Sequence, residues 1–143
     1  MDDELQRLVV RADLAEFPQL VEWTEGFARR LELPASTSYA IQLCLEEAFS
    51  NIVRYALSGR SDGADQDKDV RITLARHDGA VVLMIEDSAA AFDPLTVAAP
   101  TAPASIEDAV VGGQGINLMR KFSQRMEYER RDGMNRLRLH FTV

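Results

Sequence analysis

The sequence predicts a two-layer α+β sandwich, in which helices cover one face of a mixed or antiparallel sheet. Three observations support this prediction. The local patterns follow the order strand, helix, helix, hairpin, long loop, helix, hairpin. Both predicted hairpins turn at an Asp-Gly pair, which favours a tight connection between antiparallel strands. The length of 143 residues suits a single domain, spanning residues 1–143, with one core of moderate size.

The N-terminal part predicts a strand followed by a helix. Residues 5–12 combine β-forming side chains with alternation, which is typical of a half-buried strand. Pro18 is well placed to open a helix that runs to about Leu33, because the first turn of a helix tolerates proline. The apolar stripe of this helix consists of Leu20, Trp23, Phe27 and Leu31.

A second, longer helix is predicted after Pro34 and extends to about Leu57. It contains the single cysteine, Cys44, which we interpret as a small buried side chain because the chain offers no disulfide partner. Glu47 and Asn51 lie near the boundary between the apolar and polar sides of this helix. Its apolar stripe consists of Ile41, Leu45, Ala48 and Ile52.

The C-terminal part predicts two hairpins and one helix. Residues 70–76 and 81–87 alternate like strands, and residues 116–124 show a short helical period. Residues 125–131 and 134–143 form the second predicted hairpin. Between the first hairpin and the helix runs a long Ala- and Pro-rich stretch without periodicity, which is typical of a functional loop or a disordered segment.

Composition excludes several classes of function. The net charge of −7 opposes binding to nucleic acid, whose phosphates attract clustered Lys and Arg. There is no long uncharged apolar run that would cross a membrane, and the acidic N-terminus does not resemble a signal peptide. We therefore expect a cytoplasmic protein with neither a nucleic-acid nor a membrane partner. His77 and His140 share no metal-ligand spacing with Cys44, so no zinc site is expected.

The first chemical pattern lies on the second helix. Residues four apart stack on one line, so Glu47, Asn51 and Tyr55 form a narrow strip. A carboxylate there can orient or deprotonate a hydroxyl group, and the Asn51 amide oxygen can bind Mg²⁺ that bridges phosphates. By itself this spacing is more often a solvated helix face.

The second pattern follows the strand at residues 81–87. Asp87 ends this strand and is followed by small residues as far as Phe92. Small side chains let a planar ligand approach the backbone, and a carboxylate can accept a hydrogen bond from an exocyclic amine such as that of adenine. The alternative is that Asp87 starts a turn and Phe92 belongs to the core.

The third pattern is a group of glycines, Gly112, Gly113 and Gly115, directly before the last helix. Backbone N–H groups at the start of a helix form a favourable place for phosphate. The alternative is a helix entrance that requires positive φ angles.

In this order and setting, the three patterns resemble the N, G1 and G2 boxes of the Bergerat-type, histidine-kinase-like ATP-binding fold of gyrase, heat-shock-90 chaperones, histidine kinases and MutL. The resemblance extends over nearly the whole chain. Its nearest branch is that of the bacterial anti-sigma factor serine/threonine kinases. The segments that carry it are "LCLEEAFSNIVRYAL", "MIEDSAAAFDP" and "GGQGINLMRKFSQRMEYERRDGMNRLRLHF".

The resemblance implies a role for each matching position, with ATP and Mg²⁺ as cofactors. Glu47 is implied as the general base or water-orienting carboxylate, Asn51 as the Mg²⁺ ligand and Asp87 as the acid that recognises adenine. One position departs from the family pattern, because Ala89 stands where the G1 box usually has glycine. Its methyl group would crowd the adenine edge. The implied nucleotide-binding set is Asn51, Asp87, Ala89, Phe92, Gly113 and Gly115.

The resemblance also implies a function and partners. Such proteins bind a sigma factor and phosphorylate a serine or threonine of a STAS-type antagonist, which releases the sigma factor in a partner switch. They often dimerise, so a homodimer is compatible with this reading. An alternative is a non-catalytic module of the same fold that senses nucleotide or sequesters a protein partner. A sensor histidine kinase is not expected, since no phosphoacceptor helical hairpin fits in this chain.

Overall fold

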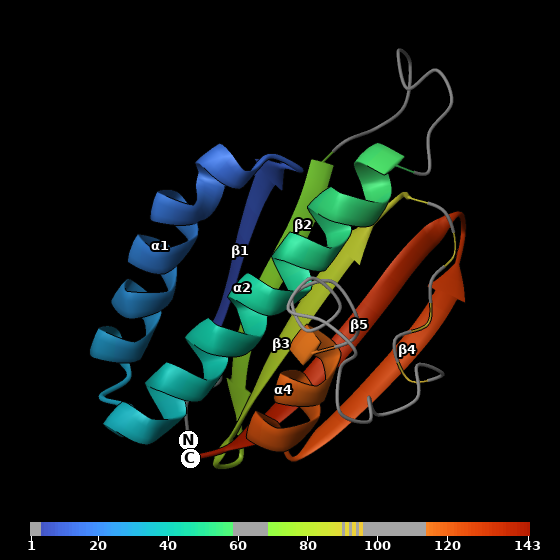
Figure 1. Ribbon diagram of the computed structural model, residues 1–143. Helices are drawn as coiled ribbons and strands as arrows, with labels where there is room; N and C mark the ends of the chain where they lie inside the picture. The colour runs from blue at the N-terminus through green and yellow to red at the C-terminus, as the bar shows by residue number, and fades with distance from the viewer. Residues whose placement is uncertain (1–3, 59–68, 90, 92, 94, 96–113) are drawn as a thin grey trace.

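The computed structural model describes residues 4–58, 69–89, 91, 93, 95 and 114–143 (Figure 1). Within them, the chain forms a twisted sheet with helices lying across it. In chain order, the elements are β1 (Glu4–Arg11), the 3-10 turn η1 (Leu14–Glu16), α1 (Phe17–Arg30), α2 (Ala35–Ser58), β2 (Asp69–His77), β3 (Ala80–Asp87), α4 (Gln114–Phe122), β4 (Arg125–Arg131) and β5 (Met134–Thr142).

The sheet contains five strands in the order β1-β2-β3-β5-β4, and every neighbouring pair is antiparallel. The two predicted hairpins are β2–β3 and β4–β5. In both turns the Asp and the Gly have positive φ, at 49° and 76° for Asp78 and Gly79 and at 54° and 75° for Asp132 and Gly133. Such turns match the twist of antiparallel strands, which explains why the Asp-Gly pairs predicted them correctly.

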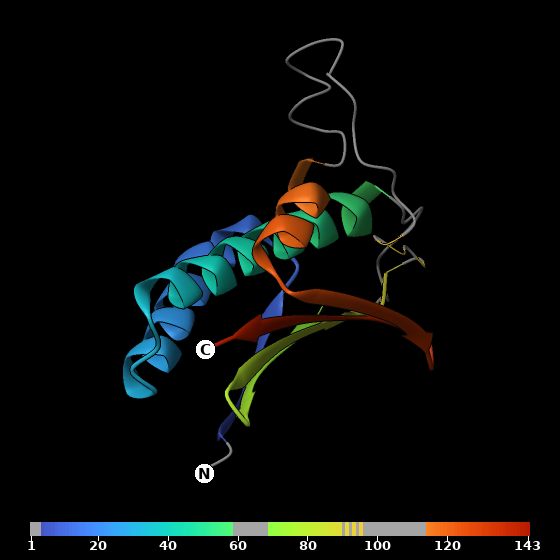
Figure 2. The same cartoon turned by 90° about the horizontal axis from the view of Figure 1, so that it is seen from below.

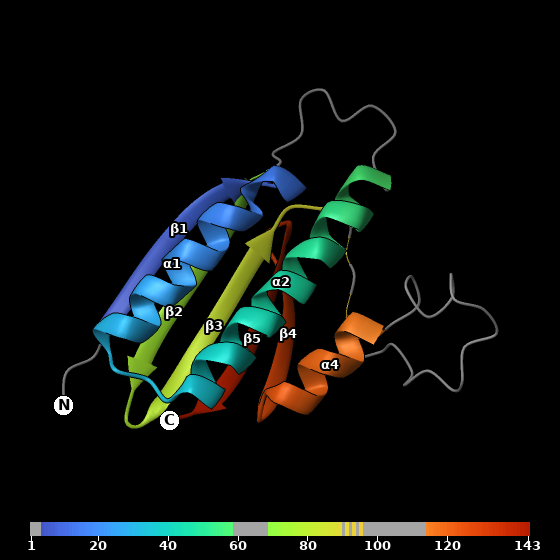
Figure 3. The same cartoon turned by 60° about the vertical axis from the view of Figure 1, so that its left-hand side comes forward.

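All the described helices lie on one face of the sheet, which confirms the predicted two-layer α+β class (Figure 2). Along β3, buried and half-buried residues alternate, and this alternation distinguishes the two faces of the sheet. Val81, Leu83 and Ile85 are buried beneath the helices, whereas Met84 and Glu86 point to the opposite face and are half-buried. Among the described helices, α2 lies between α1 and α4 and packs against both (Figure 3). None of these helices is long and apolar enough to cross a membrane.

The core forms where the helix stripes meet the sheet. In α1, Leu20 and Phe27 are fully buried, and Trp23 packs against the core with part of its surface exposed. Leu31, which directly follows the helix, packs against the core in the same way. The predicted stripe of α2 is likewise buried, apart from Ile52, which is half-buried. The faces that the two helices bury are therefore confirmed. The second helix also has the predicted extent, whereas α1 ends at Arg30, before the predicted end at about Leu33.

Cys44 lies inside this core and is fully buried, as its position in the helical pattern predicted. Burial, and secondarily the negative charge of Glu47, raise the pKa of the Cys44 thiol from 9.0 to about 12. Because the thiolate is the reactive form, the native thiol is expected to be inert near neutral pH.

We therefore predict that Cys44 resists alkylation in the native protein. At pH 8 the raised pKa lowers the thiolate fraction about a thousandfold relative to an unperturbed thiol, so iodoacetamide should react at least that much more slowly. Mass spectrometry of samples labelled with and without urea measures the ratio, with Cys44→Ala as the blank. Equal rates in the native and unfolded states would contradict the buried placement.

Candidate active site

Asp87 ends β3 on the side that faces the helices. It continues the buried series of alternate residues along the strand, and its side chain is only 7% exposed. Its Oδ1 accepts hydrogen bonds from the backbone N–H of Ala89, at 2.9 Å, and from Nδ2 of Asn135, at 3.1 Å. A buried carboxylate needs such donors, because burial of an unpartnered charge is costly. The predicted acid is therefore both buried and held in place.

Asn135 stands directly opposite Asp87 in the register of β3 and β5. Its side chain is 7% exposed. Its Oδ1 accepts hydrogen bonds from the Tyr128 hydroxyl, at 2.5 Å, and from a guanidinium nitrogen of Arg130, at 3.3 Å. Both donors project from β4, the strand next to β5. The carboxylate thus belongs to a polar network that extends over three strands.

Ala89 is buried immediately after the strand, with 5% of its surface exposed. Its carbonyl oxygen accepts a 2.7 Å hydrogen bond from Arg130 and a longer one, at 3.4 Å, from Asn135. Among the described residues other than glycine, φ is positive only at Glu32, Asp78 and Asp132. The backbone at position 89 therefore does not require glycine, and alanine fits here without conformational strain.

Glu47 and Asn51 lie on α2, one helical turn apart, and both are half-buried, as predicted for the boundary of the apolar face. Glu47 is close enough to the core for its charge to affect Cys44. The Asn51 amide oxygen accepts a long hydrogen bond, at 3.5 Å, from Arg54. A bond of that length is weak, so this oxygen is readily available to another cation. The side chain of Tyr55 lies outside the described part.

The glycine-rich segment is described only at its end. Gly115 lies in the first turn of α4, whereas Gly112, Gly113 and Phe92 fall outside the described residues. From α4, Arg120 donates a 3.1 Å hydrogen bond to the carbonyl oxygen of Leu95. This contact ties the last helix to the chain that follows Asp87.

Tyr128, Arg130 and Asn135 were not identified from the sequence. A signal for Asn135 was present, because it is the first helix-facing position of β5 and the following ones are apolar. A polar residue in an otherwise apolar series generally needs an explanation, since buried polar groups are hydrogen-bonded. Tyr128 and Arg130 take alternate positions on the same face of β4.

The oxygen atoms of Asn51 and Glu47 are of a kind that would suit a magnesium ion held mainly by phosphates. Mg²⁺ keeps several waters and is commonly bound by one or two protein oxygens together with the substrate's phosphates. The Asn51 side chain has an oxygen of this kind, and the Glu47 carboxylate lies one turn away. Within the described ranges, there is no cluster of three or more His, Cys, Asp or Glu residues that would form an all-protein metal cage.

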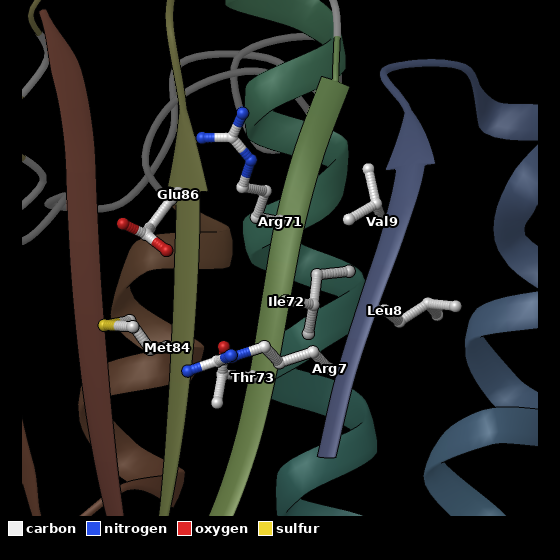
Figure 4. Close-up of a pocket in the computed structure, with 8 residues that line it drawn as sticks. All are labelled: Arg7, Leu8, Val9, Arg71, Ile72, Thr73, Met84 and Glu86. Carbon is white, nitrogen blue, oxygen red and sulfur yellow. The ribbon is translucent and has the colours of Figure 1, made fainter. Parts of the chain in front are cut away.

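A separate hollow of about 280 Å³ lies on the opposite, helix-free face of the sheet (Figure 4). Arg7 and Arg71 flank it, and Met84 and Glu86 lie along its other side. Glu86 points away from the helix layer, and its neighbour Asp87 points toward it. The hollow is therefore separated from the candidate site by the thickness of the sheet.

Comparison with known proteins assigns the family. The histidine kinase-like ATPase domain family matches residues 10–141. The chain belongs to this family. The serine/threonine-protein kinase BtrW of Bordetella bronchiseptica is 37% identical over 117 residues, which cover 82% of this chain and 79% of that protein. Together, these matches confirm both the resemblance found in the sequence and the predicted enzyme class, a protein serine/threonine kinase.

Among solved structures, the crystal structure of the SiaB–SiaC complex from Pseudomonas aeruginosa contains a chain of the same fold. The two chains superpose with a TM-score of 0.61 at 15% sequence identity, covering 96% of this chain and 89% of the other. This likeness shows that the fold is shared with a protein of low sequence identity.

We predict that Ala89→Gly destabilises the protein by about 1–2 kcal/mol, because glycine adds backbone freedom to the unfolded chain and the buried methyl group is lost. Urea unfolding measures the change. Ala91→Gly, at an exposed position of the same segment, is the matched control and should have the smaller effect. A gain in stability from Ala89→Gly would show that the alanine is strained.

Proposed function

We propose that this chain is an ATP- and Mg²⁺-dependent protein serine/threonine kinase that acts as an anti-sigma regulatory factor. The observation that carries the proposal is the buried, multiply hydrogen-bonded carboxylate of Asp87 at the end of β3, in a family member 37% identical to a serine/threonine kinase. A carboxylate held at this depth is suited to recognise a ligand rather than to interact with solvent.

In this proposal the nucleotide lies between α2 and the end of β3. Asp87 accepts a hydrogen bond from the exocyclic amine of adenine, with Ala89 and Phe92 beside the base. Gly113 and Gly115 offer backbone N–H groups to the phosphates near the positive end of α4. The carboxyl-terminal part of α2 and the end of β3 reach the same edge of the molecule, which supports this placement (Figure 1).

Asn51 would hold the magnesium ion, which, when bound, neutralises charge on the triphosphate. The Glu47 carboxylate orients the acceptor hydroxyl and takes its proton. The hydroxyl oxygen forms a bond to the γ-phosphorus while the bond from that phosphorus to the β–γ bridging oxygen breaks, and ADP leaves. The half-buried position of Glu47 suits this role, because partial removal from water strengthens its interaction with a nearby proton.

The proposed acceptor is a serine or threonine of a STAS-domain antagonist, and the proposed second partner is a sigma factor or another regulator. This partner switch is supported by the resemblance to anti-sigma factor kinases and by the kinase class of BtrW. We place the protein in the cytoplasm and allow for a homodimer. The net charge of −7 argues against nucleic acid as a partner.

We predict that Glu47→Gln lowers phosphoryl transfer at least ~100-fold, because the amide cannot accept the hydroxyl proton. The assay incubates the protein with labelled ATP, Mg²⁺ and its cognate STAS protein. Glu46→Gln, at the adjacent half-buried position, is the matched control and should retain activity. Undiminished transfer by Glu47→Gln would rule out the proposed base.

Nucleotide binding gives a second test, by calorimetric titration with ADP. We predict that the wild type binds Mg²⁺-ADP with micromolar affinity, and that Asn51→Ala weakens this binding about tenfold because a metal ligand is lost. Chelation of Mg²⁺ with EDTA should abolish the difference between the two proteins. Asn117→Ala, on the exposed side of α4, is the control. No heat at millimolar nucleotide would instead favour the non-catalytic, protein-binding alternative.

A further inference from the structure

Among the described residues, the neighbours of the Asn135 side-chain amide are satisfied by one of its two orientations. Its Oδ1 faces two donors, the Tyr128 hydroxyl and the Arg130 guanidinium, while its Nδ2 faces Oδ1 of Asp87 and the carbonyl oxygen of Ala89. Turned by half a revolution, the amide would set oxygen against two acceptors and nitrogen against a guanidinium that can only donate. The neighbours therefore fix the orientation independently of how the amide atoms are assigned.

The residues that fix the direction of these hydrogen bonds lie on β4. Arg130 pairs with Asn135 in the register of β4 and β5, and its guanidinium has no acceptor atom under any condition. Because Arg130 donates to Oδ1 of Asn135 on β5, the other amide atom, Nδ2, faces β3 and must donate to Asp87. The backbone N–H of Ala89 donates to the same carboxylate oxygen. With two donors directed at it, this carboxylate oxygen acts as a hydrogen-bond acceptor.

We propose that Asn135, oriented by Tyr128 and Arg130, is a specificity-determining positioning residue that keeps Asp87 a hydrogen-bond acceptor, so that the site selects a base with an exocyclic amine over one with a keto group. This inference rests on the proposed function, in which Asp87 faces the base. A keto base presents an acceptor where adenine presents a donor, so the carboxylate and the keto oxygen would face each other as two acceptors with no hydrogen bond between them. Mismatched buried polar groups are among the strongest sources of discrimination.

Two substitutions change which groups donate and which accept hydrogen bonds in this network, each in a different way. Asn135→Asp replaces the donor by a second carboxyl group beside Asp87, and two adjacent carboxyls share a proton, so that Asp87 can act as a donor. Tyr128→Phe removes one of the two groups that orient the amide and leaves Arg130 in place. Tyr39→Phe is the matched control, since Tyr39 is 61% exposed at the other end of α2.

The test compares the affinities for Mg²⁺-ADP and Mg²⁺-IDP by calorimetric titration, because inosine differs from adenosine only at the edge of the base that bears the amine: a keto group replaces the amine at C6, and N1 carries a hydrogen. We expect the wild type to prefer ADP at least ~50-fold. Asn135→Asp should reduce this ratio about tenfold, Tyr128→Phe about threefold, and Tyr39→Phe not at all. Circular dichroism and urea unfolding establish that each variant is folded, and Tyr128→Phe carries the test if Asn135→Asp does not fold.

A merely structural role would weaken binding of both nucleotides equally. An unchanged ratio in the folded variants would therefore overturn the inference, even if absolute affinities fall. A wild type that binds ADP and IDP equally would also overturn it, while leaving nucleotide binding intact. A wild type that binds neither nucleotide would overturn the proposed function, and the inference with it.

Discussion

The register between β3 and β5 is the constraint on which the candidate site depends. It places Asp87 opposite Asn135, and the same register pairs buried residues further along the two strands. A shift of one residue would turn Asn135 to the open face and bring Arg136 beneath the helices. It would also expose the apolar core positions of β5. The burial that stabilises the sheet therefore also fixes the geometry of the polar network.

The open face of the sheet reinforces the same register. There, Arg136 donates a 2.8 Å hydrogen bond to Glu86, its direct partner across β3 and β5, and also contacts Glu129 on β4. The side chains of Arg136 and Glu86 are only 22% and 14% exposed, so this ion pair is less screened than one on the outer surface. Both faces of the β3–β5 pair thus oppose a shift: apolar contacts and the Asp87 network on one side, and paired charges on the other.

Much of this architecture was predictable because it depends on local patterns. Alternation identified the strands, the Asp-Gly pairs identified both hairpins, and helical spacing placed Glu47 and Asn51 at the edge of a buried stripe. The end of β3 at Asp87 was equally apparent. These are properties of short segments, and they do not depend on which strands become neighbours.

The hydrogen-bonded surroundings of Asp87 could not be predicted in this way. Asn135 lies 48 residues further along the chain, and its contact with Asp87 depends on β5 being inserted between β3 and β4. Neither the strand order nor the register is encoded by local periodicity. Whether the backbone at position 89 requires glycine was also not apparent from the sequence, and the structure shows that φ is not positive there. That the Ala89 methyl group crowds the adenine edge stays a prediction. The roles of Phe92 and Gly113, outside the described residues, stay predictions.

The buried thiol of Cys44 has a practical consequence for experiments on this chain. It is the only cysteine in the sequence, and the core shields it from reagents. A cysteine introduced on the surface would therefore be the sole site for a maleimide dye or a spin label, with no need to remove the native residue first. Distances and motions in solution become measurable in a molecule whose interior packing is left intact.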